Sequence, residues 1–220
     1  MNTDGSVEKK VAAFFSQYAS FQMKRGVVFI DPANEPSGIF YIEQGVAREY
    51  LISKNGNEIT LNLYKSGSFL PMPWAIAHIP NAHFFEVMED MQIRKAPKSD
   101  AILFLKKQPD VVLDLLRRVF IGTDGLWGRI GSLTSDNSFV KLAATIYFLA
   151  KRFGISRNED GEHITVTIQV GEKDIASYAG MSRETVSREL QKLKKQHIVT
   201  FEKKLLSINS CKRLEKILSM

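Results

Sequence analysis

Residues 172–190 read Glu-Lys-Asp-Ile-Ala-Ser-Tyr-Ala-Gly-Met-Ser-Arg-Glu-Thr-Val-Ser-Arg-Glu-Leu. This spacing predicts two short helices joined by a tight turn, because Gly180 can adopt a positive φ and Ala176 is small where the helices approach each other. Val186 is expected to pack back between the two helices. Ser182 is expected to be the N-cap of the second helix, with its hydroxyl on helix amides or on a phosphate. The pattern is typical of a helix-turn-helix.

A pair of short strands is predicted directly after the second helix. Residues 198–201 and 205–208 are apolar runs that flank Glu-Lys-Lys at 202–204. Such a hairpin would form a wing with Lys203 and Lys204 at its tip. The helices and the hairpin together predict a winged helix-turn-helix that binds double-stranded DNA in the major groove.

The excess of basic residues lies in this part of the chain. Residues 1–136 contain 15 Lys and Arg and 15 Asp and Glu, whereas residues 137–220 contain 15 and 9, so the whole net charge of +6 lies in the second segment. This asymmetry favours a module that binds a polyanion, joined to a neutral module. No apolar run approaches the ~20 residues of a membrane span, and no leader pattern is visible, so a cytoplasmic protein without a membrane partner is expected.

The first half of the chain predicts an antiparallel β domain. Between residues 21 and 96, short alternating apolar runs such as 38–42 and 47–53 are separated by turn residues. The turn at 43–45 is expected to separate these two strands, and Asn55 followed by Gly56 is a strong hairpin signal. Many short strands at regular spacing favour a sandwich or jelly-roll barrel.

A long helix is predicted from Pro109 onward. Its apolar positions are spaced 4-3-4-3-4-3, which keeps one stripe facing a partner helix, so a dimerisation helix is expected. Four glycines, at 122, 125, 128 and 131, each cost ~1 kcal/mol relative to Ala. They suggest a helix that bends or partly unwinds as a switch; alternatively, the helix breaks near Gly122. The stripe consists of Val112, Leu116, Val119, Thr123, Leu126, Ile130 and Leu133.

The predicted fold is therefore α+β in three parts. Residues 1–108 are expected to form a β-roll sensor domain, 109–136 the dimerisation helix, and 137–220 the winged helix-turn-helix domain. Within the last part, a helix over 138–153 and a short strand from Ile164 to Ile168 are predicted to precede the motif.

The segment 180–188, Gly-Met-Ser-Arg-Glu-Thr-Val-Ser-Arg, resembles the recognition helix of the cyclic AMP receptor protein/FNR (Crp/Fnr) family of bacterial transcription factors. The order of β-roll, long helix and winged helix-turn-helix is also similar to that family. The resemblance implies a cyclic-nucleotide-binding-like β-roll and a transcriptional regulator, not an enzyme. It further implies a homodimer on a palindromic DNA site, with RNA polymerase as another partner.

Four side chains on the second helix are expected to contact bases. Arg183, Glu184, Ser187 and Arg188 lie at i, i+1, i+4 and i+5 and share one face. Arginine can pair bidentately with guanine, and a carboxylate can accept from cytosine N4. The alternative is a solvated helix with an ordinary ion pair between Glu184 and Arg188. The expected phosphate contacts are Ser182, Thr185, Lys173, Lys192, Lys203 and Lys204.

The resemblance narrows the expected half-site to two sequences. Arg183, Glu184 and Arg188 match the base-contacting positions of the cyclic AMP receptor type, which implies TGTGA. Ser187 with Glu184 and Arg188 matches the FNR type, which implies TTGA. Both sets of determinants are present, so the choice between them stays open.

No cofactor is expected. Family members that bind cyclic nucleotides hold the ribose with a Gly-Glu pair and the phosphate with an Arg-Ser pair. In this sequence Pro71 and Met72 occupy the Gly-Glu positions, and residues 81–84 occupy the Arg-Ser region and contain no arginine. A buried phosphate would therefore be too costly to desolvate. Cys211 is the only cysteine, which excludes the four-cysteine iron–sulfur cluster of the FNR type.

The stretch 71–80, rich in apolar and aromatic residues, replaces the nucleotide-binding residues. It predicts either a pocket for a small apolar effector or a β-roll that these side chains simply fill. The expected pocket residues are Met72, Trp74, His78 and Phe84.

A different class of protein is the alternative to a regulator. His78, His83 and Glu86 suggest a cupin-like metal-dependent enzyme with an appended DNA-binding domain. The two histidines are five residues apart with Pro80 between them, whereas ligands on one strand alternate. No metal site is therefore expected.

Overall fold

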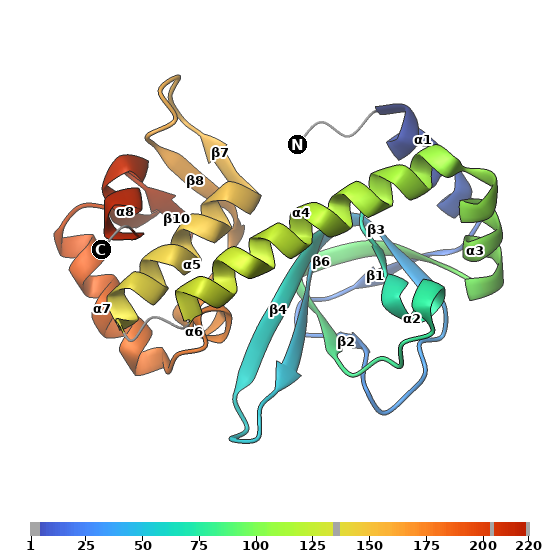
Figure 1. The fold of residues 1–220 in the computed structure, drawn as a ribbon, viewed down its shortest axis with the longest axis horizontal. Coiled ribbons are helices and arrows are strands. Elements are labelled where there is room, and N and C mark those ends of the chain that lie inside the picture. The colour runs from blue at the N-terminus through green and yellow to red at the C-terminus, as the bar shows by residue number, and fades with distance from the viewer. Residues whose placement is uncertain (1–4, 134–136, 203–204, 219–220) are drawn as a thin grey trace. The chain divides into compact units, whose positions relative to one another are not determined.

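The computed structural model describes residues 5–133, 137–202 and 205–218 (Figure 1). The chain divides into two compact units, one formed by Met1–Ser53 and Thr60–Gly122 and the other by Lys54–Ile59 and Thr123–Met220. Each unit buries its own apolar core. Among the described residues, no helix is both long and apolar enough to cross a membrane.

The first unit is built on an antiparallel β-sheet, as predicted. The central pair of long strands, β3 and β6, is flanked by the shorter ones. One cluster of buried side chains, including Ile42, Phe85 and Ile93, fills the space that the sheet encloses. The sheet order is β1 (Ser20–Met23), β6 (Phe84–Ala96), β3 (Ile39–Ile52) and β4 (Glu58–Lys65), with β2 (Val28–Ile30) on β6 and β5 (Phe69–Leu70) on β3.

The prediction of a turn at residues 43–45 was wrong. β3 continues through this segment as one strand, and its pairing with β6 shifts register between Ile42 and Ala47. Gly45 adopts φ +91°, and a Cβ there would lie 2.5 Å from the carbonyl oxygen of Asp90. The glycine therefore permits a β-bulge with a close backbone approach, which bends the strand without ending it.

Three helices cover one side of this unit. α1 (Gly5–Phe15) buries Val7, Val11 and Phe15 in a core that it shares with α2 (Met72–Ala77) and α3 (Lys98–Lys107). α2 ends at His78, whose φ of +56° is left-handed and stops the helix after six residues. The amine of Lys98 lies 4.2 Å from the ring centre of Trp74 and also donates to its carbonyl oxygen, so α3 holds α2 in place.

α4 (Pro109–Leu133) is one continuous helix, so the alternative of a break near Gly122 is not observed. A Cβ at Gly122, Gly128 or Gly131 would meet nothing within 4 Å, and one at Gly125 would lie 3.5 Å from the Phe148 ring. Close packing within one chain therefore does not explain these glycines. Residues 134–136 of the expected dimerisation helix lie outside the described residues.

The second unit contains the predicted helix over residues 138–153, and its bounds are confirmed. α5 (Ser138–Phe153) begins at the N-cap Asn137, whose side chain accepts from the amide of Phe139 at 2.9 Å. It ends at Gly154, where a Cβ would lie 2.2 Å from the carbonyl oxygen of Ala150. The sheet of this unit has the order β7 (Gly154–Ser156), β8 (Ile164–Gln169), β10 (Leu205–Ile208) and β9 (Val199–Glu202), and α8 (Cys211–Leu218) follows it.

The last turns of α4 contact α6 (Glu172–Ala179) through a buried arginine. Arg129 donates to the carbonyl oxygen of Tyr178 at 2.7 Å, and its guanidinium lies 4.5 Å from the centre of that ring. Burial lowers the pKa of Arg129 and raises the pKa of Tyr178. Because the carbonyl lies in the last turn of α6, the guanidinium also neutralises the negative end of that helix.

The Tyr178 hydroxyl is buried without a hydrogen-bond partner among the described residues, so Tyr178→Phe is expected to stabilise the fold. Removing an unpaired buried hydroxyl should raise the free energy of unfolding by about 1 kcal/mol. Urea denaturation measures this change. Tyr147→Phe is the matched control, because the Tyr147 hydroxyl donates to Glu215 at 2.7 Å and its removal should bring no gain. Equal losses in both variants would contradict the assignment.

Candidate nucleic-acid interface

The turn between α6 and α7 (Arg183–Lys195) has the geometry that the sequence predicts. Gly180 ends α6 with φ +61° and ψ +35°, and the amide of Met181 donates to the carbonyl oxygen of Ala176 at 3.1 Å. At the other end of α6, Asp174 accepts from the amide of Gly171 at 2.8 Å. The buried residues Ile175, Val186 and Leu190 lock the two helices together.

Ser182 is the N-cap of α7. Its Oγ accepts from the amide of Thr185 at 3.2 Å and lies 3.1 Å from the Thr185 hydroxyl. Together with the left-handed Gly180 before it, this cap fixes where α7 begins and therefore which side chains lie on its first turns. The prediction of an N-cap at this position is confirmed.

The first two turns of α7 present the four side chains that were predicted to share a face. Arg183 and Arg188 are exposed, with 72% and 63% of their side-chain surface accessible. Glu184 is exposed, and Ser187 is half-buried. The pKa of Glu184 is lowered because its carboxylate accepts from its own backbone amide at the helix N-terminus, with smaller contributions from Ser182 and Arg183.

Two of these four side chains are near Glu172 at the start of α6. The Ser187 hydroxyl lies 3.4 Å from Glu172 Oε1, and Arg183 Nε lies 3.9 Å from Oε2. Both distances are long, and both arginines remain largely exposed, so these contacts are weak and can be exchanged for contacts with DNA.

Glu189 is a functional candidate that the sequence reasoning missed. Its side chain is 3% exposed, and it accepts from Arg188 Nε at 3.1 Å and from Lys192 Nζ at 2.6 Å. Burial opposes ionisation of Glu189, but these two cations outweigh that cost and lower its pKa. Arg188 therefore pairs with the adjacent Glu189, not with Glu184 as the ion-pair alternative expected. A signal was available, because position 189 lies three residues after Val186, on the buried side of the helix.

The remaining predicted DNA contacts are lysines of α6, α7 and the wing. Lys173 is exposed in the first turn of α6, and Lys192 is exposed in the last turn of α7. The wing consists of β9 and β10, which pair antiparallel from Val199 opposite Ile208 to Glu202 opposite Leu205. Lys203 and Lys204, which were predicted to lie at its tip, are outside the described residues.

Of the four side chains that were expected to line one effector pocket, Trp74 and His78 line a common cavity, whereas Met72 and Phe84 do not line it. Met72 and Trp74 are buried in the core beneath α3, and Trp74 donates to Glu35 at 3.1 Å. Phe84 stacks on Tyr50 with ring centres 5.1 Å apart. His78 lines a cavity of about 700 Å³ and, together with Trp74, a smaller one of about 380 Å³.

The side chains of the metalloenzyme alternative have other partners. His83 Nδ1 lies 2.7 Å from Glu49 Oε1, and Glu86 accepts from Arg48 Nε at 3.0 Å. Within the described residues, no group of three or more His, Cys, Asp or Glu side chains could hold a metal ion.

Two helices joined by a left-handed glycine, a second helix with exposed arginines on its first turns, and an adjacent two-stranded hairpin define a winged helix-turn-helix domain. Residues 140–217 match the Crp-like helix-turn-helix domain. The class of protein is thus a DNA-binding regulator.

Relatives and solved structures extend the likeness over most of the chain. The fumarate and nitrate reduction regulatory protein of Yersinia pestis is 24% identical over 195 residues, 89% of this chain and 76% of that protein. The anaerobic regulatory protein of Haemophilus influenzae is also 24% identical, over 85% of this chain and 71% of that protein.

The fold matches a CooA mutant from Carboxydothermus hydrogenoformans with a TM-score of 0.77, at 19% identity over 94% of this chain and 90% of that one. It also matches a transcriptional regulator of the CRP/FNR family from Thermus thermophilus with a TM-score of 0.67, at 18% identity over 92% and 99%. The chain therefore contains a Crp-like helix-turn-helix domain and is similar over most of its length to transcriptional regulators of the Crp/Fnr type. Its relatives are regulators and not enzymes, so the metalloenzyme alternative is not favoured.

Proposed function

We propose that this protein regulates transcription in the cytoplasm as a homodimer that binds a two-fold symmetric DNA site through α7. The observation that supports this proposal most directly is the exposure of Arg183 and Arg188 on the first turns of a helix held by a buried helix pair. The expected half-sites resemble TGTGA or TTGA and lie about one helical turn, ~34 Å, apart. Arg183, Glu184, Ser187 and Arg188 contact bases, and Ser182, Thr185, Lys173 and Lys192 contact phosphates.

The proposal of a homodimer rests on the exposed face of α4. Val112, Leu116, Val119, Leu126 and Ile130 are each between 42% and 53% exposed, although they occupy the predicted seam. Burying such a stripe against a second copy removes it from water, as in a coiled coil.

A second apolar row on α4 runs beside the seam. Leu113, Phe120 and Trp127 are spaced by seven residues and are between 64% and 68% exposed. In a parallel pair of helices, an e position beside the seam of one helix faces a g position beside the seam of the other helix. Trp127 occupies an e position and Gly122 occupies the g position five residues before it, so Trp127 of one copy would lie against Gly122 of the second copy. A large ring packed on this position would explain why residue 122 is a glycine, although a Cβ there would meet nothing within 4 Å in its own chain.

The regulator is proposed to act without cyclic AMP and without an iron–sulfur cluster, because the phosphate-binding arginine is missing and Cys211 is the only cysteine. RNA polymerase is its proposed protein partner, and a small-molecule effector in the first unit is its proposed signal. An effector can shift the equilibrium between two arrangements only if it binds one of them better.

Selection of bound sequences from random DNA tests the proposed function. The expected product is a palindrome with guanine in each half-site and a spacing of one helical turn between half-site centres. Enrichment of sites without two-fold symmetry, or no enrichment, would contradict the proposal.

A further inference from the structure

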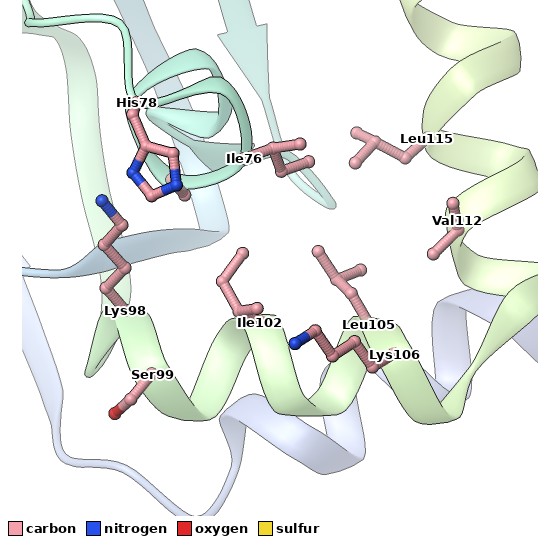
Figure 2. A pocket seen from close by; sticks show the side chains of 10 residues that line it. Ile76, His78, Lys98, Ser99, Ile102, Leu105, Lys106, Val112 and Leu115 are labelled. Carbon is pink, nitrogen blue, oxygen red and sulfur yellow. The ribbon is translucent and has the colours of Figure 1, made fainter.

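An open cavity of about 700 Å³ lies between α2, α3 and the first turns of α4, wholly within the first unit (Figure 2). Its volume lies in the range of small-molecule sites in proteins. Figure 2 shows Ile76, Leu105 and Leu115 pointing into the same space from the three helices. Ile102 and Val112 complete an apolar lining.

Basic and neutral polar groups occur in this lining, but no acidic residue does. Lys98 and Lys106 are on α3, and His78 ends α2. The Lys98 amine is fixed near the cavity by its contacts with Trp74. Lys106 and the His78 ring have no polar partner among the described residues, so both are available to a ligand.

We propose that this cavity binds an anionic amphiphile, a molecule with a carboxylate head and an apolar chain of roughly eight to ten carbons. The chain lies against Ile76, Ile102 and Leu115, and the carboxylate pairs with Lys106 and Lys98. Charge complementarity selects an anion, because both charged lining residues are cationic. A wholly apolar ligand would make no ion pair with the two lysines, and a cation would be repelled by them.

The proposed ligand contacts Val112 and Leu115 on α4 as well as α2 and α3. Occupancy therefore acts on the start of the helix that bears the dimer stripe. The role of the ligand as an effector rests on the proposed function, whereas its binding rests on the cavity alone.

Calorimetric titration of the full-length protein with octanoate tests the binding site, with 1-octanol and butyrate as comparison ligands. Octanoate is expected to bind saturably, one per chain, and both comparison ligands should bind several-fold more weakly. The first lacks the charge and the second lacks most of the apolar chain. Absence of saturable octanoate binding, or equal affinity for octanol, would overturn the proposal.

Two neighbouring lysines in the last turn of α3 provide a matched pair of variants. Lys106→Gln is expected to weaken octanoate binding about threefold to fivefold and to leave octanol binding unchanged. Lys107→Gln should behave as the parent, because Lys107 does not line the cavity. Equal effects of the two substitutions would overturn the assignment of the carboxylate.

A third variant tests the apolar part of the site. Ile76→Trp should abolish binding of both eight-carbon ligands, because Ile76 is 51% exposed and a larger side chain there fills the cavity without disturbing the core. Unchanged octanoate binding in this variant would overturn the proposal. Octanoate binding that occurs only after the dimer dissociates would also overturn the proposal. In that case a second copy of the chain, and not a small ligand, would fill the cavity in the dimer.

Gel-shift assays with the selected DNA separate the two proposals. DNA binding without octanoate binding overturns only the ligand site. Octanoate binding without DNA binding supports the ligand site and contradicts the proposed function.

Discussion

Val119→Glu is expected to convert the protein to a monomer and to lower its affinity for a palindromic site by about a hundredfold or more. Val119 lies in the middle of the apolar stripe on α4 and is 53% exposed in the single chain. A carboxylate in the seam must lose water without gaining a partner, and the two-fold symmetry places two such charges close together. Each uncompensated charge costs several kcal/mol, and every 1.4 kcal/mol is tenfold in affinity.

Ile121→Glu is the matched control for this experiment. Ile121 is 46% exposed on the same helix, but two residues along the helix place it on the face away from the stripe. This variant should remain a dimer and bind DNA as the parent does. Both substitutions add the same charge to the same helix. A difference between the two variants in oligomeric state or DNA affinity therefore comes from the position of the charge in the dimer seam.

Sedimentation velocity gives the oligomeric state, and gel shifts on a full palindrome and on a single half-site give the affinities. Val119→Glu should lose affinity for the palindrome and keep the parent's weak affinity for the half-site, because α7 is unchanged. A dimeric Val119→Glu variant, or an equal loss for Ile121→Glu, would contradict a dimer through this stripe.

The C-terminal part of the fold could be predicted closely because its determinants are local. The bounds of α5 follow from Asn137 at its start and Gly154 at its end, both adjacent in sequence to the helix they limit. Gly180 and Ser182 set the turn and the second helix in the same way. Caps and left-handed glycines act within one turn of chain, so a single sequence contains the signal.

The first unit was less predictable because its determinants are distant in sequence. Gly45 looks like a turn residue, and only the approach of the Asp90 carbonyl from β6 shows that it belongs to a bulge within β3. Of the predicted effector residues, Trp74 and His78 line a common cavity but Met72 and Phe84 do not, for a similar reason. Lys98 on α3 packs over Trp74, which buries the indole in the core, whereas other side chains of α2, α3 and α4 line the larger cavity.

Arg188→Ala is expected to lower affinity for the preferred site by about 1–3 kcal/mol for each half-site, or roughly fivefold to 150-fold for each, and to remove the preference for guanine at one position of each half-site. Arg188 Nε donates to the buried carboxylate of Glu189 at 3.1 Å. This bond orients the guanidinium, and Nη1 and Nη2 have no partner among the described residues. Those two nitrogens can form the planar fork with which an arginine pairs with O6 and N7 of guanine.

Arg188→Lys distinguishes a base contact from a phosphate contact. A lysine keeps the positive charge but lacks the planar fork. If Arg188 contacts phosphate, Arg188→Lys should restore most of the affinity lost in Arg188→Ala, equally for all sequences. If Arg188 contacts guanine, as we expect, the lysine variant should bind random DNA as the parent does and still lose its preference for guanine.

Lys192→Ala completes the comparison, because Lys192 is the other cation on Glu189. A phosphate contact contributes to all sequences alike, and the loss of one contact from each subunit of the dimer should reduce the slope of log K against log salt by about 1.8. Gel shifts on the selected site and on a scrambled site at several salt concentrations measure both quantities. Arg188 can still donate to Glu189 when the lysine is removed, so the preference for guanine should remain in Lys192→Ala. Its loss there would show that the two cations act as one unit, and the assignment of base recognition to Arg188 alone would be wrong.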